Sequence, residues 1–517
     1  MKQSNSNRYG KLLRTILISG GAMALNALMT VFLVPVISNT VGTEAYGFVS
    51  LAKSFEQYAM IITTALNAFA ARYIVIAYHK GDRETANTFF SSTVYGDAIL
   101  STALFLAAIL VVLFMNRVMR ISPELVPDVR LLFLFVFLNF WIVTMSTAFQ
   151  SAGHIKNKLD VVGVFKTLSY FCEAVVLVLC FRLLPPHVFY VGIGLVAAAL
   201  VTASGGIWLW RRYVPELHIR RRSFSWQAIR RLVLDGAWTS LNSLGGVLND
   251  GLDLLVCNLM LTPLGMGQLA FSKTFHSLFA SVFALVGQAF EPLFLKSYAQ
   301  GDKKTLLEEL RLSMKLSGMI GNIVFAGFAA LGMAFYRLWI PKEDIALIYA
   351  LTVINNLATI PRGPMFPLYY IYVLTTKNRF PTIMTIVSGL LNVLGMYLML
   401  RYTGVGIYAI VWTTAVVSAV IDFISNPLYM AHVLELPWWT FYPSILRNLL
   451  SCGIMAAVFM GLGRLYVPSS WISLIVSAMV LGCVGCALHM LVALSSRERK
   501  EAVRIILRKN RGNEEQA

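Results

Sequence analysis

Long apolar stretches follow one another along almost the whole chain, and they constrain the fold more than any other feature of the sequence. Fourteen of them reach the roughly 20 residues that a helix needs to cross the hydrocarbon core of a membrane. Only 13% of the 517 residues are charged, and little chain remains for a soluble domain. We therefore expect an all-α polytopic membrane protein. The predicted spans are 12–38, 44–68, 90–115, 129–151, 160–182, 187–210, 233–261, 265–290, 312–336, 346–374, 381–401, 404–428, 443–464 and 470–494.

The basic residues gather on one side of these predicted spans. Lys and Arg number 43 against 25 Asp and Glu, and most basic residues outside the spans fall in every second connection. Under the positive-inside rule this distribution places both termini in the cytoplasm. The longest of these connections, residues 211–232, carries seven Arg. At a membrane surface such a segment favours anionic lipids over nucleic acid as the partner.

Several classes of function lack the residues that they require. The six cysteines all fall in apolar stretches, which argues against a disulfide framework and against a zinc site. The sequence has no glycine-rich phosphate-binding loop, and no connection is long enough for a nucleotide-binding domain. We therefore expect no enzymatic activity and no cofactor. Transport would run on a gradient of Na⁺ or H⁺, or on the membrane potential.

An internal repeat divides the chain. Residues 47–85, shifted by 220 without a gap, match residues 267–305 at seven positions. The matching turns, GDRET and GDKKT, both follow the second span of their half, which supports a true repeat. The matched pairs are Gly47 and Gly267, Lys53 and Lys273, Phe55 and Phe275, Tyr78 and Tyr298, Gly81 and Gly301, Asp82 and Asp302, and Thr85 and Thr305.

Each repeat holds six predicted spans. Because six is an even number, both repeats enter the membrane in the same direction, as parallel repeats about an axis along the membrane normal. The predicted organisation is a six-helix bundle (1–210), a basic cytoplasmic linker (211–232), a second six-helix bundle (233–430), two additional helices (431–495) and a basic cytoplasmic tail (496–517).

Polar residues recur at helical spacing on repeat-related spans. The second span carries Lys53 and Glu56, and the eighth carries Lys273 and His276. Ionisable groups inside a membrane are costly and usually face a cavity or a partner. These four residues therefore predict a wet cleft that contacts an anionic substrate. Two alternatives stay open: such groups only cross-link helices, or Lys53 and Glu56, three residues apart, form a local ion pair.

Arg362 lies in the middle of the tenth predicted span, between Pro361 and Pro367. Prolines should kink or unwind this helix and free backbone groups that need a cavity or a ligand. An arginine suits bidentate phosphate contacts, so Arg362 is a third candidate for a cavity cation. Asp97 and Asp422, near the cytoplasmic ends of their spans, are expected to anchor loops.

The candidate site for ion coupling lies on the seventh and eleventh spans. Asp250 and Asp253 supply carboxylates, and Asn392 supplies a neutral oxygen. The glycines of the seventh span make this helix easy to bend, and carbonyls released by a bend would add ligands for Na⁺. The alternative is that the acids pair with a basic residue elsewhere in the cavity.

Three motifs carry a resemblance to a known family. GTEAYGFVSLAKSF at 42–55 enters the second span, a YxxGD turn follows spans two and eight, and KNK at 156–158 recurs as KNR at 377–379. With the plan of six, six and two spans, the chain resembles the polysaccharide-transporter flippases of the multidrug/oligosaccharidyl-lipid/polysaccharide exporter superfamily. The resemblance covers essentially the whole chain.

This resemblance implies a V-shaped pair of bundles with a cationic central cavity. It also implies alternating access that turns a polyprenyl-pyrophosphate-linked saccharide from the inner to the outer leaflet of a bacterial plasma membrane. In this sequence the cavity cations would be Lys53, Lys273 and Arg362. Glycan-assembly enzymes would be partners of a multi-pass transporter that acts as a monomer.

Two other functions stay open. A drug or metabolite antiporter of the same superfamily has a similar number of spans. Proton-coupled drug exporters of that branch typically rely on an acid in the first span, however, and residues 12–38 contain none. A membrane-embedded glycan polymerase or glycosyltransferase usually places acid or Arg residues in a sizeable outer loop, whereas the predicted outer connections are short.

Overall fold

The computed structural model describes residues 21, 25, 27–375, 377–494 and 498–499. In this part of the chain every regular element is a helix, as the apolar stretches predict. The chain divides into two compact units, Met1–Ala270 and Phe271–Ala517. About half of the first predicted span and most of the predicted basic tail lie outside the described residues. The predicted bundle and linker boundaries stay a prediction.

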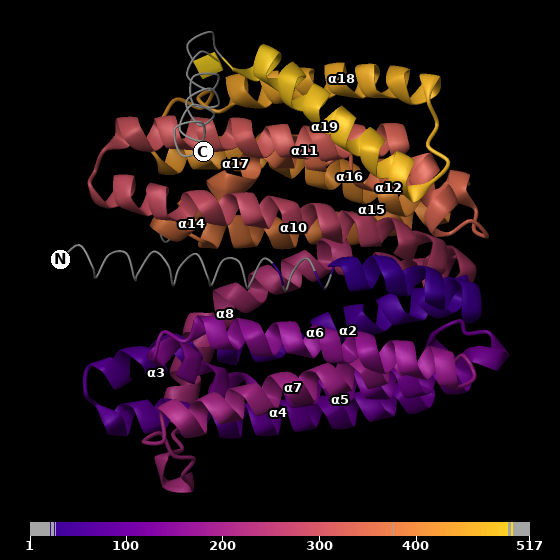
Figure 1. Cartoon of the computed structure of the whole chain (residues 1–517). Helices are drawn as coiled ribbons and strands as arrows, with labels where there is room; N and C mark the ends of the chain where they lie inside the picture. Colours follow the sequence, from indigo (N-terminus) through magenta and orange to yellow (C-terminus); the bar gives the residue numbers. More distant parts are fainter. Residues whose placement is uncertain (1–20, 22–24, 26, 376, 495–497, 500–517) are drawn as a thin grey trace, which may run out of the picture. The chain divides into compact units, whose positions relative to one another are not determined.

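Long helices packed side by side make up the N-terminal unit (Figure 1). Helix α5 packs against α4 and α7, α6 packs against α7, and α2 packs against α8. Large apolar side chains such as Leu66, Phe90 and Leu232 are fully buried where α2, α4 and α8 meet. The elements are α2 (Thr43–Asn67), α3 (Ala70–His79), α4 (Arg83–Val118), η1 (Pro123–Leu125), α5 (Val126–Ile155), α6 (Leu159–Leu183), α7 (Tyr190–Tyr213), η2 (Arg221–Ser223), α8 (Trp226–Gly246), η3 (Val247–Gly251) and α9 (Asp253–Met260).

In the C-terminal unit α11 is the central helix, because α12, α13, α18 and α19 all pack against it. Helices α18 and α19, which follow the predicted second bundle, therefore pack within this unit. Helix α10 (Pro263–Ala299) begins in the first unit and continues into the second. The remaining elements are α11 (Lys303–Trp339), α12 (Ile345–Asn355), α13 (Thr359–Met365), η4 (Phe366–Tyr369), α14 (Tyr370–Thr375), α15 (Arg379–Tyr402), α16 (Tyr408–Val420), η5 (Ile421–Ser425), α17 (Asn426–Val433), α18 (Tyr442–Leu465) and α19 (Trp471–Ala493).

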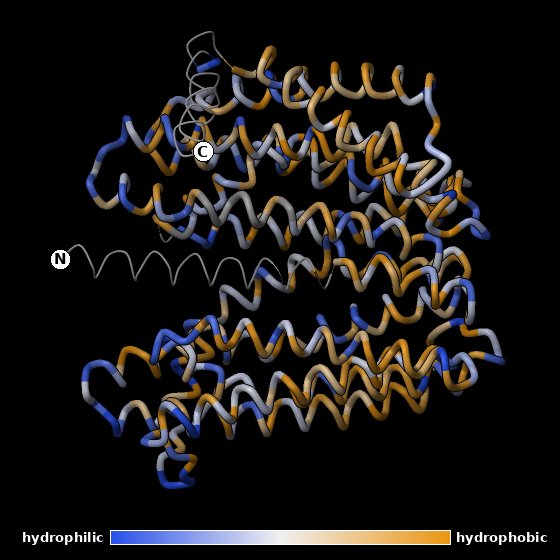
Figure 2. Tube along the Cα trace, in the orientation of Figure 1, coloured by the Kyte–Doolittle hydropathy of each residue, from blue (hydrophilic) through white to orange (hydrophobic). Residues whose placement is uncertain are grey.

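Among the described residues, eleven helical segments are long and apolar enough to cross a membrane. Figure 2 shows that hydrophobic residues dominate the middles of the helices and that hydrophilic residues gather at their ends. The other three predicted spans fall on the shorter apolar helix Ala27–Thr40, on α8 with η3 and α9, and on α10. The total of fourteen spans stays a prediction.

Three predicted spans are interrupted rather than continuous. The proline-rich segment around Arg362 forms α13, the 3-10 helix η4 and α14, which confirms the predicted break. The seventh span contains the π-helical turn η3 between α8 and α9. A second π-helical turn, η5, separates α16 from α17. Such turns are frequent at functional sites.

Candidate functional site

A cluster of polar side chains joins α2, α5 and α6 in the N-terminal unit. The Nδ2 atom of Asn139 donates a hydrogen bond to Oε1 of Glu56 over 2.7 Å. Glu173 is 4% exposed, and Lys53 interacts electrostatically with both Glu56 and Glu173. Lys53 itself is exposed. The positive charge of Lys53 is thus opposed by two carboxyl groups, one of which comes from α6.

The break in the seventh predicted span places Asp250 and Asp253 in two different helical elements. Asp250 lies within the π-helical turn η3, and Asp253 is the first residue of α9 and is fully buried. The hydroxyl of Tyr58 donates a hydrogen bond of 2.5 Å to the carbonyl of Gly251. Tyr58 also interacts electrostatically with Asp253. The bend therefore exposes a carbonyl to a side chain of α2, and Asp253 lies beside this contact.

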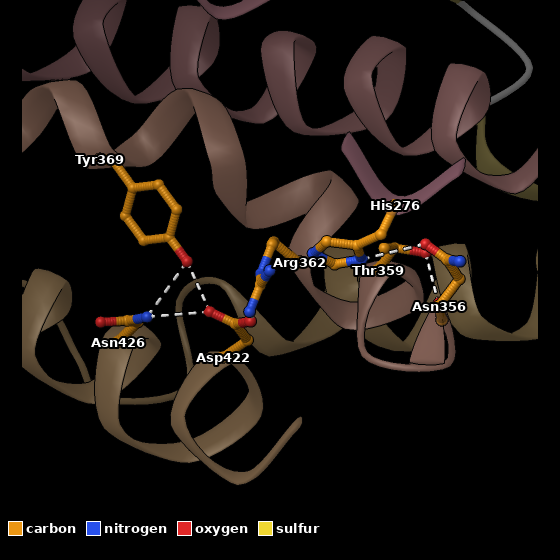
Figure 3. A network of polar contacts seen from close by, with 7 residues as sticks. All are labelled: His276, Asn356, Thr359, Arg362, Tyr369, Asp422 and Asn426. Atoms are coloured by element: carbon orange, nitrogen blue, oxygen red, sulfur yellow. Dashed lines mark hydrogen bonds and ion pairs between the residues drawn. The ribbon is translucent and has the colours of Figure 1, made fainter. Parts of the chain in front are cut away.

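A second polar network lies in the C-terminal unit, around the interrupted helices α13 and α16 (Figure 3). The Nε atom of Arg362 donates to Oδ2 of Asp422 over 2.8 Å. The hydroxyl of Tyr369 donates to Oδ1 of Asp422 over 2.5 Å, and Nδ2 of Asn426 donates to the same oxygen over 3.1 Å. Asp422 therefore joins three elements, and the expectation that it anchors a loop is wrong.

The two partners in the Arg362–Asp422 ion pair differ in exposure. The Asp422 side chain is 4% exposed and the Arg362 side chain is 25% exposed. A buried carboxylate needs a partner, because an uncompensated charge away from water is costly. Arg362 supplies this partner and keeps part of its side chain accessible. An arginine carries five N–H donors, so one ion pair does not exhaust its capacity to bind an anion.

His276 and Lys273 lie one turn apart on α10. The Nδ1 atom of His276 is 3.2 Å from Oδ1 of the fully buried Asn356, at the end of α12 (Figure 3). Thr359 donates to the carbonyl of Asn356 over 2.6 Å, which fixes the start of α13. Lys273 is partly buried. The predicted polar stripe of α10 is thus connected to the same interrupted segment that carries Arg362.

The remaining predicted residues are distributed over both units. Asn392 is fully buried on α15 and accepts a hydrogen bond of 3.3 Å from Thr414 of α16. Asp97, expected to anchor a loop, is instead fully buried on α4 and accepts a hydrogen bond of 2.7 Å from Asn67 of α2. The cleft between Lys53 and Lys273, and the shared ion site of Asp250, Asp253 and Asn392, join residues of different units and stay predictions.

Sequence reasoning missed several partners in these clusters. Tyr369 and Asn426 complete the network of Asp422, and Asn139 completes the cluster of Glu56. A neutral side chain in an apolar stretch gives little signal on its own. The usable signal was the presence of an acid within a span, since a membrane-embedded carboxylate requires a partner on another helix.

Comparisons with known proteins agree with this architecture. A family described as "Polysaccharide biosynthesis protein" matches residues 12–298. The chain is 25% identical over 492 residues to the uncharacterized membrane protein EpsK of Bacillus subtilis (strain 168). The matched region covers 95% of this chain and 97% of that protein.

Two solved structures show the fold. An inward-facing multidrug resistance MATE family transporter of the MOP superfamily superposes with a TM-score of 0.69 at 12% identity, covering 81% of this chain and 99% of that one. The lipid II flippase MurJ, in an inward closed conformation, superposes with a TM-score of 0.62 at 14% identity, covering 92% of this chain and 99% of that one.

Proposed function

Because the chain belongs to the family of polysaccharide biosynthesis proteins, we propose that it is a flippase for a lipid-linked saccharide. It would turn a polyprenyl-pyrophosphate-linked precursor from the inner to the outer leaflet of a bacterial plasma membrane. The observation that carries the proposal is the family match, which covers more than half of the chain and includes both α2 and the repeat-related start of α10.

The extent of the structural similarity supports a flippase over a drug exporter. The multidrug transporter is covered almost completely, yet it leaves about a fifth of this chain unmatched, whereas the lipid II flippase leaves less than a tenth. Helices α18 and α19 follow the predicted second bundle. The proposed substrate is larger than a drug and carries a lipid tail. The chain is correspondingly longer than the part that matches the multidrug transporter.

The proposed substrate contacts are Lys53, Lys273 and Arg362, with His276 and Glu56 beside them. A pyrophosphate group is a strong acceptor of charge-assisted hydrogen bonds, and part of the Arg362 side chain is exposed beside its buried partner. The lysines supply compact charges, and the guanidinium group supplies a planar fork for phosphate oxygens. These cations would lower the cost of moving an anion through the membrane interior.

Ion coupling is proposed for Asp250, Asp253 and Asn392, with Na⁺ or H⁺ as the coupling ion. Support comes from the buried carboxyl group of Asp253 at the start of α9 and from the π-helical turn before it. Substitution of each acid by Asn should slow transport and weaken its dependence on the ion gradient. Unchanged rates and unchanged ion dependence in both variants would remove this site from the mechanism.

Both termini are proposed to lie in the cytoplasm, where the basic segment 211–232 would contact anionic lipids. Arg220, Arg221 and Arg222 are exposed in this segment, which suits binding to a charged membrane surface. Glycan-assembly enzymes would supply the saccharide on that side, and the transporter itself would act as a monomer.

A flipping assay tests the proposal. The purified full chain is placed in liposomes with a labelled lipid-linked saccharide, and loss of the label from the outer surface is followed without nucleotide. We expect protein-dependent flipping that Lys273→Gln reduces and that Lys342→Gln, a change of an exposed lysine in a connection, leaves intact. A chain that moves no lipid-linked saccharide but exchanges a drug for Na⁺ or H⁺ would instead be an antiporter. This second candidate function is favoured by the TM-score of 0.69 to the multidrug transporter.

A further inference from the structure

Three buried polar atoms on α2 and α4 have no hydrogen-bond partner in the described part of the chain. They are Oδ2 of Asp97, Oγ of Ser101 and Oδ1 of Asn67. Asp97 and Ser101 are both fully buried and lie one helical turn apart, on the same face of α4. Asn67 of α2 contacts Asp97, because its Nδ2 atom is 2.7 Å from Oδ1 of Asp97. Three oxygen atoms that are able to accept hydrogen bonds are therefore gathered in one buried place.

The Ser101 hydroxyl departs from the usual behaviour of a serine or threonine in a helix. Such hydroxyls commonly donate to the carbonyl one turn earlier, and on the same helix Thr93 does so to Phe89 over 2.8 Å. Within the described residues Ser101 makes no such bond. Its hydroxyl is available to the carboxyl group of Asp97, the residue one turn earlier.

The site is closely packed and apolar around these atoms. A Cβ atom on Gly96 would lie 2.8 Å from Cδ2 of Leu66 and 3.6 Å from Cδ1 of Ile229. Helices α2 and α8 therefore approach α4 closely beside Asp97. A water molecule needs space and two to four polar partners, and hard cations generally collect six or more oxygen ligands. A proton needs neither the space nor the ligands.

Charged groups of the neighbouring elements do not offer Asp97 a partner. Within the described part of the chain its one side-chain partner is Asn67. Residues 131–153 of α5 include no charged side chain, and Lys53 and Glu56 of α2 lie about three turns or more from Asn67. The charged residues and the histidine of α3, η2 and α8 are all exposed; they are Arg72, His79, Arg221, Arg222, Arg230, Arg231 and Asp235. The tyrosines of α3 bond to other acids, Tyr73 to Asp235 and Tyr78 to Glu216.

We propose that Asp97, Asn67 and Ser101 form a proton-binding site inside the N-terminal unit. A proton on Oδ2 of Asp97 converts one of three acceptors into a donor, which bonds to Ser101 or to Asn67. The Ser101 hydroxyl is a donor for the remaining acceptor. One proton thus satisfies all three atoms, and its release leaves a buried carboxylate held by one amide. A role of this site in coupling rests on the proposed transport function, but its protonation does not.

Infrared difference spectroscopy of the purified full chain in lipid tests the site independently of transport. We expect a carboxylic acid C=O band at neutral pH that disappears in Asp97→Asn and persists in Asp344→Asn, a change of an exposed helix cap. Ser101→Ala and Asn67→Leu keep the carboxyl group, and at least one of them should shift the band, because the acid loses a hydrogen-bond acceptor.

Three results would overturn the proposal. The first is the absence of an acid band that depends on Asp97. The second is a band that neither Ser101→Ala nor Asn67→Leu moves, since the three atoms would then not act together. The third is loss of the band on adding Na⁺ at constant pH, which would make this a sodium site. A chain that shows the band but flips no saccharide would retain the proton site and lose the proposed function.

Discussion

Gly47 and Gly267, which occupy the same position in the two repeats, pack directly against each other. A Cβ atom on Gly47 would lie 2.9 Å from Cα of Gly267, and a Cβ atom on Gly267 would lie 2.2 Å from the carbonyl oxygen of Thr43. The starts of α2 and α10 therefore approach to backbone contact. The repeat match at these glycines reflects a close approach that a side chain would prevent.

Substitution of Gly267 by Ala should consequently destabilise the protein. The new methyl group meets backbone atoms, which cannot rotate away as a side chain can, and overpacking of this kind costs about 1–3 kcal/mol. We expect a lower melting temperature in detergent and weaker flipping. Gly461→Ala is the matched control, since a Cβ atom on this helical glycine meets nothing within 4 Å. Equal melting temperatures for the two variants would contradict the contact.

The matched residues Asp82 and Asp302 cap helices α4 and α11 in the same way. The carboxyl group of Asp302 accepts hydrogen bonds from the hydroxyl and the backbone N–H of Thr305. These two bonds hold the pKa of Asp302 below its ordinary value, and the bond from the hydroxyl has the larger effect. The side chain and backbone of Thr85 lower the pKa of Asp82 in the same way. Gly81 and Gly301, with φ of 80° and 70°, allow the tight turn before each cap.

This capping predicts a pH-dependent loss of stability. A carboxyl group with a lowered folded-state pKa contributes its full stabilisation above the unfolded-state pKa and loses it as the pH falls through the folded-state pKa. Asp302→Ala should lower the melting temperature at neutral pH, and the difference from the wild type should narrow in acid. Asp302→Asn keeps a capping oxygen and should lose less. A difference that stays constant down to strongly acidic pH would contradict the role of the charge.

The sequence predicted those features of the fold that depend on neighbouring residues. Apolar stretches predicted the helices, prolines predicted the interruption around Arg362, and the repeat predicted matching turns before α4 and α11. Each of these rests on local physical chemistry: backbone hydrogen bonding in lipid, the missing N–H of proline and the cap of a helix end. Asp82 and Asp302 behave alike because their local sequences are alike.

Partners from distant helices were not predictable in the same way. Arg362 pairs with Asp422, and Lys53 interacts with Glu173, although these pairs are far apart in sequence. Which residues meet depends on the rotation of each helix about its axis. Helices that are apolar on most sides give little indication of that rotation. The expectation that Asp422 anchors a loop failed for this reason.

The Arg362–Asp422 pair permits a test that separates structure from substrate binding. Arg362→Gln leaves a buried carboxylate without its ionic partner, so we expect destabilisation of about 3–5 kcal/mol. The double variant Arg362→Gln/Asp422→Asn removes both charges and should recover much of this stability. If Arg362 also contacts the substrate, the double variant will fold but flip poorly, which thermal melting and the flipping assay together would show. Full recovery of both would limit Arg362 to a structural role.

Charge removal at the two repeat-related lysines should have unequal effects. Lys53 is opposed by Glu56 and Glu173, so part of its charge is already balanced within the protein. We therefore expect Lys273→Gln to reduce flipping more than Lys53→Gln. Lys53→Gln should instead cost stability, since it leaves two carboxyl groups facing each other, and adding Glu56→Gln should relieve that cost. Flipping rates equal to the wild type in both single variants would end the substrate role of the lysines.

Transport is expected to respond to the membrane potential and to need no ATP. A pyrophosphate-linked lipid carries about two negative charges, and moving one charge across 100 mV is worth about 2.3 kcal/mol. An inside-negative potential would therefore favour outward movement by about 4–5 kcal/mol unless counter-ions cancel the charge. Flipping of a labelled lipid-linked saccharide is measured in K⁺-loaded liposomes with valinomycin, against equal internal and external K⁺ as the control. Flipping rates that change neither with the potential nor with a Na⁺ or H⁺ gradient would reject secondary coupling. Strict dependence of flipping on added ATP would reject the proposed mechanism as a whole.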